Sequence, residues 1–183
     1  MNPDATADRW YRVDADDRIV EVDPDWDQFA EANGGHTATS AHVLGQPLSD
    51  FLSGDVTRMF LAAALEATRL TGLPRTLAYR CDAPGMRRSL EMTVQPLPEG
   101  EVLVQHRLLS ATPKASATTF RYGQPPRAAW YRCSQCLRLR AANAATAWQP
   151  PEQLDLPPAA RSVVVADTVC ADCLHAAATV AAP

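Results

Sequence analysis

The first hundred residues alternate between apolar and polar positions in short runs that predict β-strands. The run YRVDADDRIVEV predicts a hairpin, with strands at Tyr11–Val13 and Ile19–Val22 on either side of an aspartate-rich turn. Three later runs, TLAYRC, LEMTVQ and EVLVQHRLL, also alternate with a period of two. In the second of these runs, Leu90, Met92 and Val94 are expected to point inward. The pattern therefore predicts two strands at the start and three more after an interval.

The interval between these strands has helical spacing. The run DPDWDQFAEAN predicts a helix with Pro24 in its first turn, and HVLGQPLSDFLS predicts brief helical turns broken by Gly45 and Pro47. The longest predicted helix runs from Asp55 to Thr71, with Asp55 as its cap and Gly72 as its stop. The apolar residues expected to face the core from this helix are Val56, Met59, Phe60, Ala63, Ala67 and Leu70.

Two strands, several helices and three strands, in that order, indicate an α+β fold. The five strands are expected to form one antiparallel sheet with helices on one face. This is the order of elements in a PAS domain, and residues 9–109 resemble one. The resemblance is closest to bacterial PAS-like proteins with a segment like YRCDAPGMRRSLEMTV and a glycine in the stretch VLGQPLSDFL. It implies a sensory or protein-interaction module that receives a signal or forms homodimers, and not an enzyme.

The resemblance also bears on cofactors. PAS domains that bind haem typically take the ligand from the long helix, and the stretch from Asp55 to Thr71 contains no histidine. The cysteine motif of flavin-binding light sensors is missing too. Neither haem nor flavin is therefore expected. His106 lies on the face of Val102 and Val104 and is interpreted as a core histidine, and Cys81 as a small buried apolar residue.

The composition changes at residue 110. Residues 110–127, SATPKASATTFRYGQPPR, have the composition of a linker. The remaining stretch, residues 128–176, has few large apolar side chains for a core of its own. Small units of this kind often depend on a bound metal for stability.

Four cysteines supply the candidate metal site. They form two CxxC pairs, CSQC and CADC, at Cys133, Cys136, Cys170 and Cys173. Two such pairs can complete a tetrahedral shell of four sulfurs, which suits one structural Zn²⁺ ion in a zinc-ribbon-like module with an enlarged loop. Iron, or no metal at all, remains open, and an oxidoreductase with labile CxxC pairs is a further alternative. The order CxxC, Trp148 and TVCADC also resembles the C-terminal part of the same bacterial proteins. Those relatives usually carry a histidine at the position of Asp167.

Charge suggests a second function. Residues 102–151 contain six arginines, Lys114 and no acidic residue, although the whole chain has a net charge of −4. The first CxxC pair is flanked by Arg132, Arg138 and Arg140. The leading hypothesis is a regulatory protein whose zinc module contacts a protein partner. The alternative is a nucleic-acid-associated factor that uses these arginines.

The sequence contains no catalytic constellation and no membrane segment. We found no Ser-His-Asp set, phosphate-binding glycine loop or paired carboxylates, so catalysis is not expected. No apolar run approaches the roughly 20 residues that cross a bilayer. The polar, acidic start MNPDATADRW does not resemble a secretory signal, and a cytoplasmic location is expected.

Overall fold

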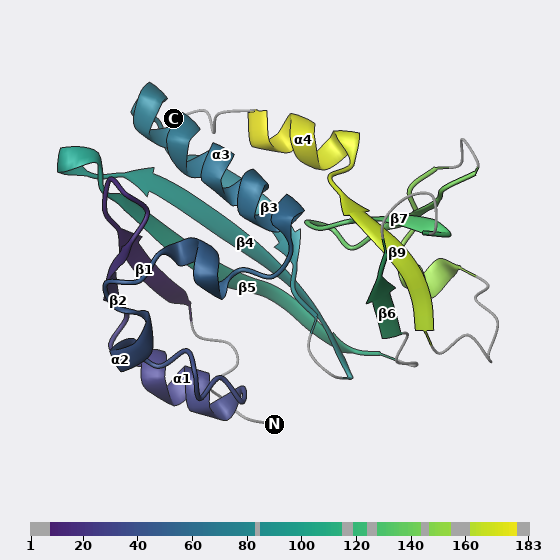
Figure 1. The fold of residues 1–183 in the computed structure, drawn as a ribbon, viewed down its shortest axis with the longest axis horizontal. Coiled ribbons are helices and arrows are strands. Elements are labelled where there is room, and N and C mark those ends of the chain that lie inside the picture. Colours follow the sequence, from purple (N-terminus) through teal and green to yellow (C-terminus); the bar gives the residue numbers. More distant parts are fainter. Residues whose placement is uncertain are drawn as a thin grey trace.

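A five-stranded antiparallel sheet, ordered β2-β1-β5-β4-β3, forms the larger part of the fold (Figure 1). The computed structural model describes residues 8–82, 85–114, 119–123, 128–143, 147–154 and 162–178. The strands of this sheet are β1 (Arg9–Val13), β2 (Ile19–Val22), β3 (Arg75–Arg80), β4 (Met86–Pro96) and β5 (Val102–Pro113). The short helix η3 (Pro98–Gly100) joins β4 to β5. The predicted hairpin is confirmed, as is the prediction that two strands before the helices and three after them join in one antiparallel sheet.

The helices between β2 and β3 cover one face of this sheet (Figure 1). They are α1 (Trp26–Ala32), α2 (Ser40–Val43), η2 (Leu48–Phe51) and α3 (Asp55–Thr71). Alternate residues of the central strands point toward the helices, and Val94, Val102 and Val104 are completely buried there. The fold is therefore α+β, with helices on one face of a five-stranded antiparallel sheet as predicted, and its core lies between the sheet and the helices.

Helix α3 has the predicted length but presents a different face to the core. Its buried residues are Leu61, Ala64, Leu65 and Thr68. Met59 and Leu70, which were expected to face the core, are 72% and 77% exposed. The predicted cap is also wrong, because Gly54 occupies the cap position and Asp55 pairs with Arg58 instead. Gly72 ends the helix as predicted, with a left-handed φ of 65° that glycine adopts at low cost.

A second, four-stranded sheet is ordered β6-β9-β7-β8. Its elements are β6 (Thr119–Tyr122), β7 (Trp130–Cys133), β8 (Leu139–Ala141), η4 (Pro151–Gln153), β9 (Ser162–Thr168) and α4 (Ala171–Ala178). Strand β9 runs parallel to both β6 and β7, and β8 is antiparallel to β7. Leu139, Val163 and Val165 form a small separate core.

Two elements fall inside the range predicted as a linker. Strand β5 continues to Pro113, and β6 pairs with β9 in the second sheet. Residues 115–118 and 124–127 of that range lie outside the described residues.

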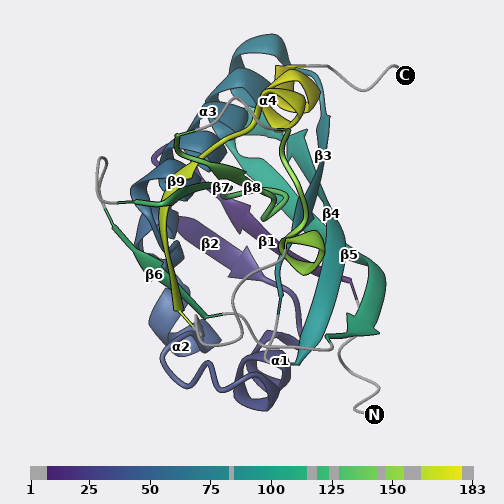
Figure 2. The same ribbon diagram turned by 90° about the vertical axis from the view of Figure 1, so that its right-hand side faces the viewer.

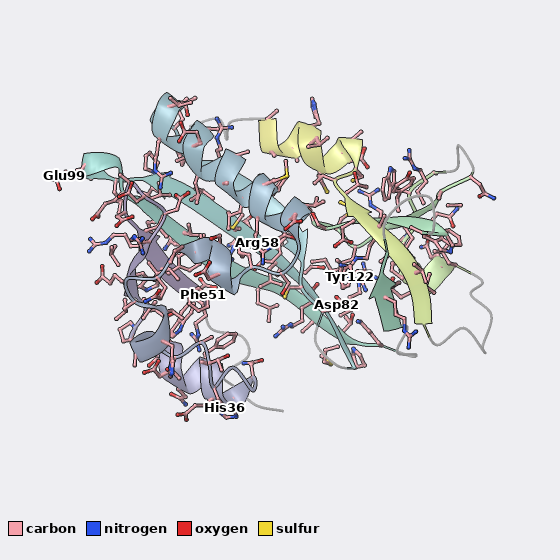
Figure 3. All side chains as sticks on the ribbon, in the orientation of Figure 1. His36, Phe51, Arg58, Asp82, Glu99 and Tyr122 are labelled. Atoms are coloured by element: carbon pink, nitrogen blue, oxygen red, sulfur yellow. The ribbon has the colours of Figure 1, made fainter. Side chains whose placement is uncertain are left out.

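The second sheet packs at the β3 edge of the first (Figure 2). The N–H of Arg80 donates to the carbonyl oxygen of Gln135, with an N–O distance of 2.7 Å. The Arg80 guanidinium pairs with Asp82, two residues along the chain, and with Glu152 of η4 beside the second sheet. Asp82 lies at this junction (Figure 3). Ala177 of α4 packs against the core of the first sheet, and its carbonyl oxygen accepts a hydrogen bond from Arg75 of β3.

No helix within the described ranges is long and apolar enough to cross a membrane.

Candidate metal centre

The first cysteine pair lies in the tight turn between β7 and β8. Cys133 ends β7, and its N–H donates to the carbonyl oxygen of Arg138 at 2.9 Å. The N–H of Leu137 donates to the carbonyl oxygen of Cys133 at 3.0 Å, and Leu137 has a left-handed φ of 57°. Such a conformation is uncommon for leucine. The turn folds the chain back so that Cys133 and Cys136 are close together.

The second pair lies where β9 leads into α4. Cys170 immediately precedes the helix, and Cys173 belongs to its first turn. The N–H of Leu174 donates to the carbonyl oxygen of Cys170 at 3.0 Å. The N–H of Cys170 points at the sulfur of Cys133, at 3.4 Å.

The four predicted cysteines converge. Their sulfur atoms all lie within 4.8 Å of one another, and the sulfurs of Cys136 and Cys170 are 3.8 Å apart. Four sulfurs around one ion at a bond length of about 2.3 Å are separated by about 3.8 Å along each edge of the tetrahedron. An iron–sulfur cluster places several iron and sulfide atoms between its cysteines and holds them farther apart. The four cysteines could therefore hold a single metal ion.

The surroundings favour negative charge on one of the four sulfurs, that of Cys136. The pKa of Cys136 is lowered, chiefly by a hydrogen bond from the Cys133 thiol and further by Arg138, whose Nε lies 3.2 Å from the Cys136 sulfur. The same hydrogen bond and burial raise the pKa of Cys133. Without a cation, four thiols this close cannot all ionise, because each thiolate raises the cost of the next. A bound divalent metal would remove this obstacle.

The arginines beside the first pair have partners within the chain. Arg132 forms a two-bond ion pair with Asp167, and Nη2 also donates to the Tyr122 hydroxyl at 2.8 Å. Arg138 pairs with Asp172 at 3.0 Å. The Arg140 guanidinium stacks on the rings of Tyr131 and Trp148, at 5.5 and 5.0 Å from the ring centres. Their positive charges therefore support the local structure.

Asp167 stands where the resembling proteins usually have a histidine. In this chain it is not part of the cysteine cluster and forms an ion pair with Arg132. It lies directly opposite Arg132 in the β7–β9 pairing, and both side chains are largely buried. The negative charge of Asp167 is therefore balanced by the Arg132 guanidinium.

Two other residues noted in the sequence, His106 and Cys81, lie outside the cysteine cluster. His106 contacts the Tyr79 hydroxyl at 3.0 Å through Nδ1, which confirms that it is a satisfied histidine of the core region. Burial lowers the pKa of His106 to about 4, so it is neutral at pH 7. The interpretation of Cys81 as buried is wrong, because it lies just past the end of β3 and is exposed.

A cavity of about 350 Å³ lies close to the first cysteine pair. The helices, the first sheet and the turn between Cys133 and Cys136 all contribute to its wall. Phe51, at the end of η2, lies on the helical side of the sheet (Figure 3), and Tyr79 and His106 reach the cavity from β3 and β5. Ser134 and Gln135 reach it from the second unit.

No role in the site was predicted for Ser134, Gln135 or Arg80. No local pattern marks them, since the first two are polar residues inside a CxxC turn. Arg80 resembles any other polar position of a strand. The charge asymmetry drew attention to Arg138, but not to its contact with Cys136. These roles depend on contacts between distant parts of the chain.

Comparisons with known proteins find likeness only among solved structures. No protein-family model and no curated protein matches the chain. A domain of an HTR-like protein from Haloarcula marismortui is 17% identical, with a TM-score of 0.40, over 56% of this chain and 98% of that domain. A domain of a sensory box sensor histidine kinase/response regulator from Geobacter sulfurreducens is 24% identical, with a TM-score of 0.39, over 55% of this chain and 82% of that domain. At these values neither likeness identifies a function for this chain.

Proposed function

We propose that this chain is a non-enzymatic regulatory protein built from two units. Residues 9–109 form the unit for signal input or dimerisation, and residues 128–176 form a unit that holds one structural zinc ion and contacts a protein partner. Residues 110–127 connect the units, with β6 of that range paired into the second sheet. The observation that carries the proposal is the convergence of four cysteine sulfurs within 4.8 Å.

Zinc is favoured by the donor set and by the role of the site. Four thiolates in a tetrahedral shell are typical of structural zinc, which leaves no open position for chemistry. Within the described residues, the buried apolar cluster of the second unit is small: it consists of Leu139, Val163 and Val165, with Phe120, Trp130 and Leu154 packed against it. A metal that joins the β7–β8 turn to the start of α4 would therefore contribute much of the stability of this unit.

A regulatory role through a protein partner is preferred to nucleic-acid binding. Arg132, Arg138 and Arg140 are engaged with Asp167, Asp172 and two aromatic rings. A phosphate backbone would have to displace these contacts. A mobility-shift assay at roughly 50 mM salt tests this preference, because binding by basic side chains is strongest at low salt. Binding that weakens steeply as salt rises, and that is lost in Arg140→Gln, would overturn it.

Metal analysis of the full-length protein tests the central proposal. The purified chain should contain about one zinc per molecule. Cys133→Ser should lose most of this zinc and expose residues 128–178 to protease, whereas Cys81→Ser, the matched control outside the cluster, should keep both zinc and protease resistance. Protein that contains no metal after growth with added zinc, and a Cys133→Ser variant as protease-resistant as the parent, would rule the proposal out.

A further inference from the structure

The cavity is walled by both units of the chain. Most of its lining comes from the first unit, with Trp26, Phe60 and Met92 among the apolar side chains. One part of the wall is the CSQC turn, through Ser134 and Gln135. These are the two residues between Cys133 and Cys136. The residues that would hold the metal are therefore adjacent in the chain to residues that line the cavity.

The two lining residues of the turn are held by contacts on both sides. The N–H of Ser134 donates to the carbonyl oxygen of Thr168 at 2.8 Å, close to the second cysteine pair. The carbonyl oxygen of Gln135 accepts from Arg80 of β3. The amide of Gln135 donates to the Ser134 hydroxyl at 3.2 Å, and Gln135 is buried. The position of this wall thus depends on the metal-binding turn and on the β3 edge together.

The chemistry of the lining indicates the class of ligand. A dry cavity of about 150 Å³ can bind benzene, so about 350 Å³ has room for roughly two rings. Arg80 is the charged side chain in the lining, and its charge is already paired with Asp82 and Glu152. The polar groups that remain are neutral hydrogen-bonding groups, such as the Tyr79–His106 pair and Gln135. A charged ligand would lose its hydration without gaining a counter-charge.

We propose that this cavity binds a small, neutral, mainly apolar molecule with one hydrogen-bonding group, and that the metal-bound CSQC turn forms part of the site. Metal and ligand then strengthen each other's binding. Without metal the turn loses its anchor to Cys170 and Cys173, and Ser134 and Gln135 no longer hold one fixed position. The ligand in turn stabilises the arrangement of the turn that binds metal, because coupling between two sites is reciprocal. The linkage between metal and ligand rests on the proposed metal site, whereas the ligand class does not.

Calorimetric titration of the full chain with 2-naphthol tests the linkage. We expect 2-naphthol to bind the zinc-loaded protein at least about fivefold more tightly than protein stripped by a chelator. Zinc should bind more tightly by the same factor when 2-naphthol is present. Its charged counterpart, 2-naphthoate, should bind at least about tenfold more weakly. No binding of 2-naphthol up to its solubility limit, or equal binding of 2-naphthoate, would overturn the ligand class.

Two variants place the binding in this cavity. Thr57 lines the cavity from α3, so Thr57→Phe should fill the space and abolish binding while zinc content stays the same. Val56→Phe, at a half-buried neighbour outside the lining, should retain binding. Equal binding in both variants would show that the molecule binds elsewhere.

A third variant tests the contribution of the turn. Gln135→Ala keeps the backbone bond to Arg80 and both cysteines, and we expect it to weaken 2-naphthol binding about three- to tenfold without loss of zinc. Gln153→Ala, on the exposed surface of η4, is its control. Unchanged affinity in Gln135→Ala would overturn the role of the turn.

The metal proposal and this inference fail in different ways. If the chain holds zinc but 2-naphthol binds equally with and without it, the linkage is overturned and the metal site stands. If the chain holds no metal, the metal site and the linkage both fail. The ligand class is then decided by 2-naphthol, 2-naphthoate and Thr57→Phe.

Discussion

The backbone N–H of Arg80 donates a hydrogen bond to the carbonyl oxygen of Gln135 across 2.7 Å. Arg80 is the last residue of β3, which is an edge strand of the first sheet. Gln135 lies inside the first CxxC pair. Edge strands expose unpaired backbone groups, and proteins often cover them with another element. Here the covering element is the turn that carries half of the candidate metal site, so the two units are joined at that turn.

Loss of the Arg80 side chain should weaken this junction. Arg80→Met keeps the length of the side chain but leaves Glu152 without this ion pair and Asp82 with only Lys114 and the backbone N–H of Arg88. Because the Arg80 and Asp82 side chains are largely buried, we expect the free energy of unfolding to fall by about 3 kcal/mol. Arg107→Met is the control, since the Arg107 side chain that pairs with Glu91 is 59% exposed, and it should cost less than about 1 kcal/mol. Urea unfolding measures both, and equal losses would contradict the prediction.

The ion pair between Arg132 and Asp167 should matter for stability and not for metal binding. Asp167→Asn keeps the shape of the side chain but leaves the Arg132 charge without a buried counter-charge, so we expect a loss of about 2 kcal/mol. Zinc content should be unchanged, because Asp167 is paired with Arg132 and lies outside the sulfur cluster. Asp172→Asn removes an acid that is 70% exposed and should cost at most about 0.5 kcal/mol. Loss of zinc in Asp167→Asn would show that this aspartate serves the metal site after all.

His106 should make the folded state less stable in mild acid. In the unfolded chain His106 takes up a proton near its ordinary pKa of 6.5, whereas burial lowers its pKa in the folded chain to about 4. Its contribution is therefore fully present above pH 6.5 and is lost as the pH falls toward 4, with about 2 kcal/mol lost by pH 5.

The measurement compares unfolding free energies at pH 7.5 and pH 5. His106→Gln should lose about 2 kcal/mol less than the parent between the two values. His42→Gln, at an exposed histidine, should lose as much as the parent. A His106→Gln variant with the same pH dependence as the parent would refute the assignment.

The face of α3 that contacts the sheet can be tested by truncation. Leu65 is almost completely buried, and Leu65→Ala should lower the free energy of unfolding by about 3 kcal/mol. Met59→Ala, on the same helix but exposed, should change it by less than about 0.5 kcal/mol. Thermal or urea unfolding of the two variants measures the difference. The reverse order would restore the face predicted from the sequence.

The strands could be predicted because an alternating pattern allows only one set of side chains to face the core. In β4, Met92 and Val94 alternate with polar residues, and a shift by one position would expose both. In helix α3 two different faces could contact the sheet, because apolar residues and alanines nearly surround its central turns. The sheet, and not the local pattern, selects Leu61 and Leu65 over Met59 and Leu70. Cys81 was placed wrongly for a related reason, since β3 ends one residue before it.

The sequence by itself determined the α+β class, the order of the strands and the four cysteines with thiol chemistry suited to a metal. These follow from residue type and from periodicities of two and 3.6, which act over neighbouring positions. Only the tertiary structure decided that the four sulfurs converge, that Arg132 meets Asp167 and that the CSQC turn lines the cavity of the other unit. These contacts join distant parts of the chain: Cys136 and Cys170 are 34 positions apart, and Arg132 and Asp167 are 35 positions apart. Their geometry is set by how the two sheets pack at β3, which no local pattern encodes.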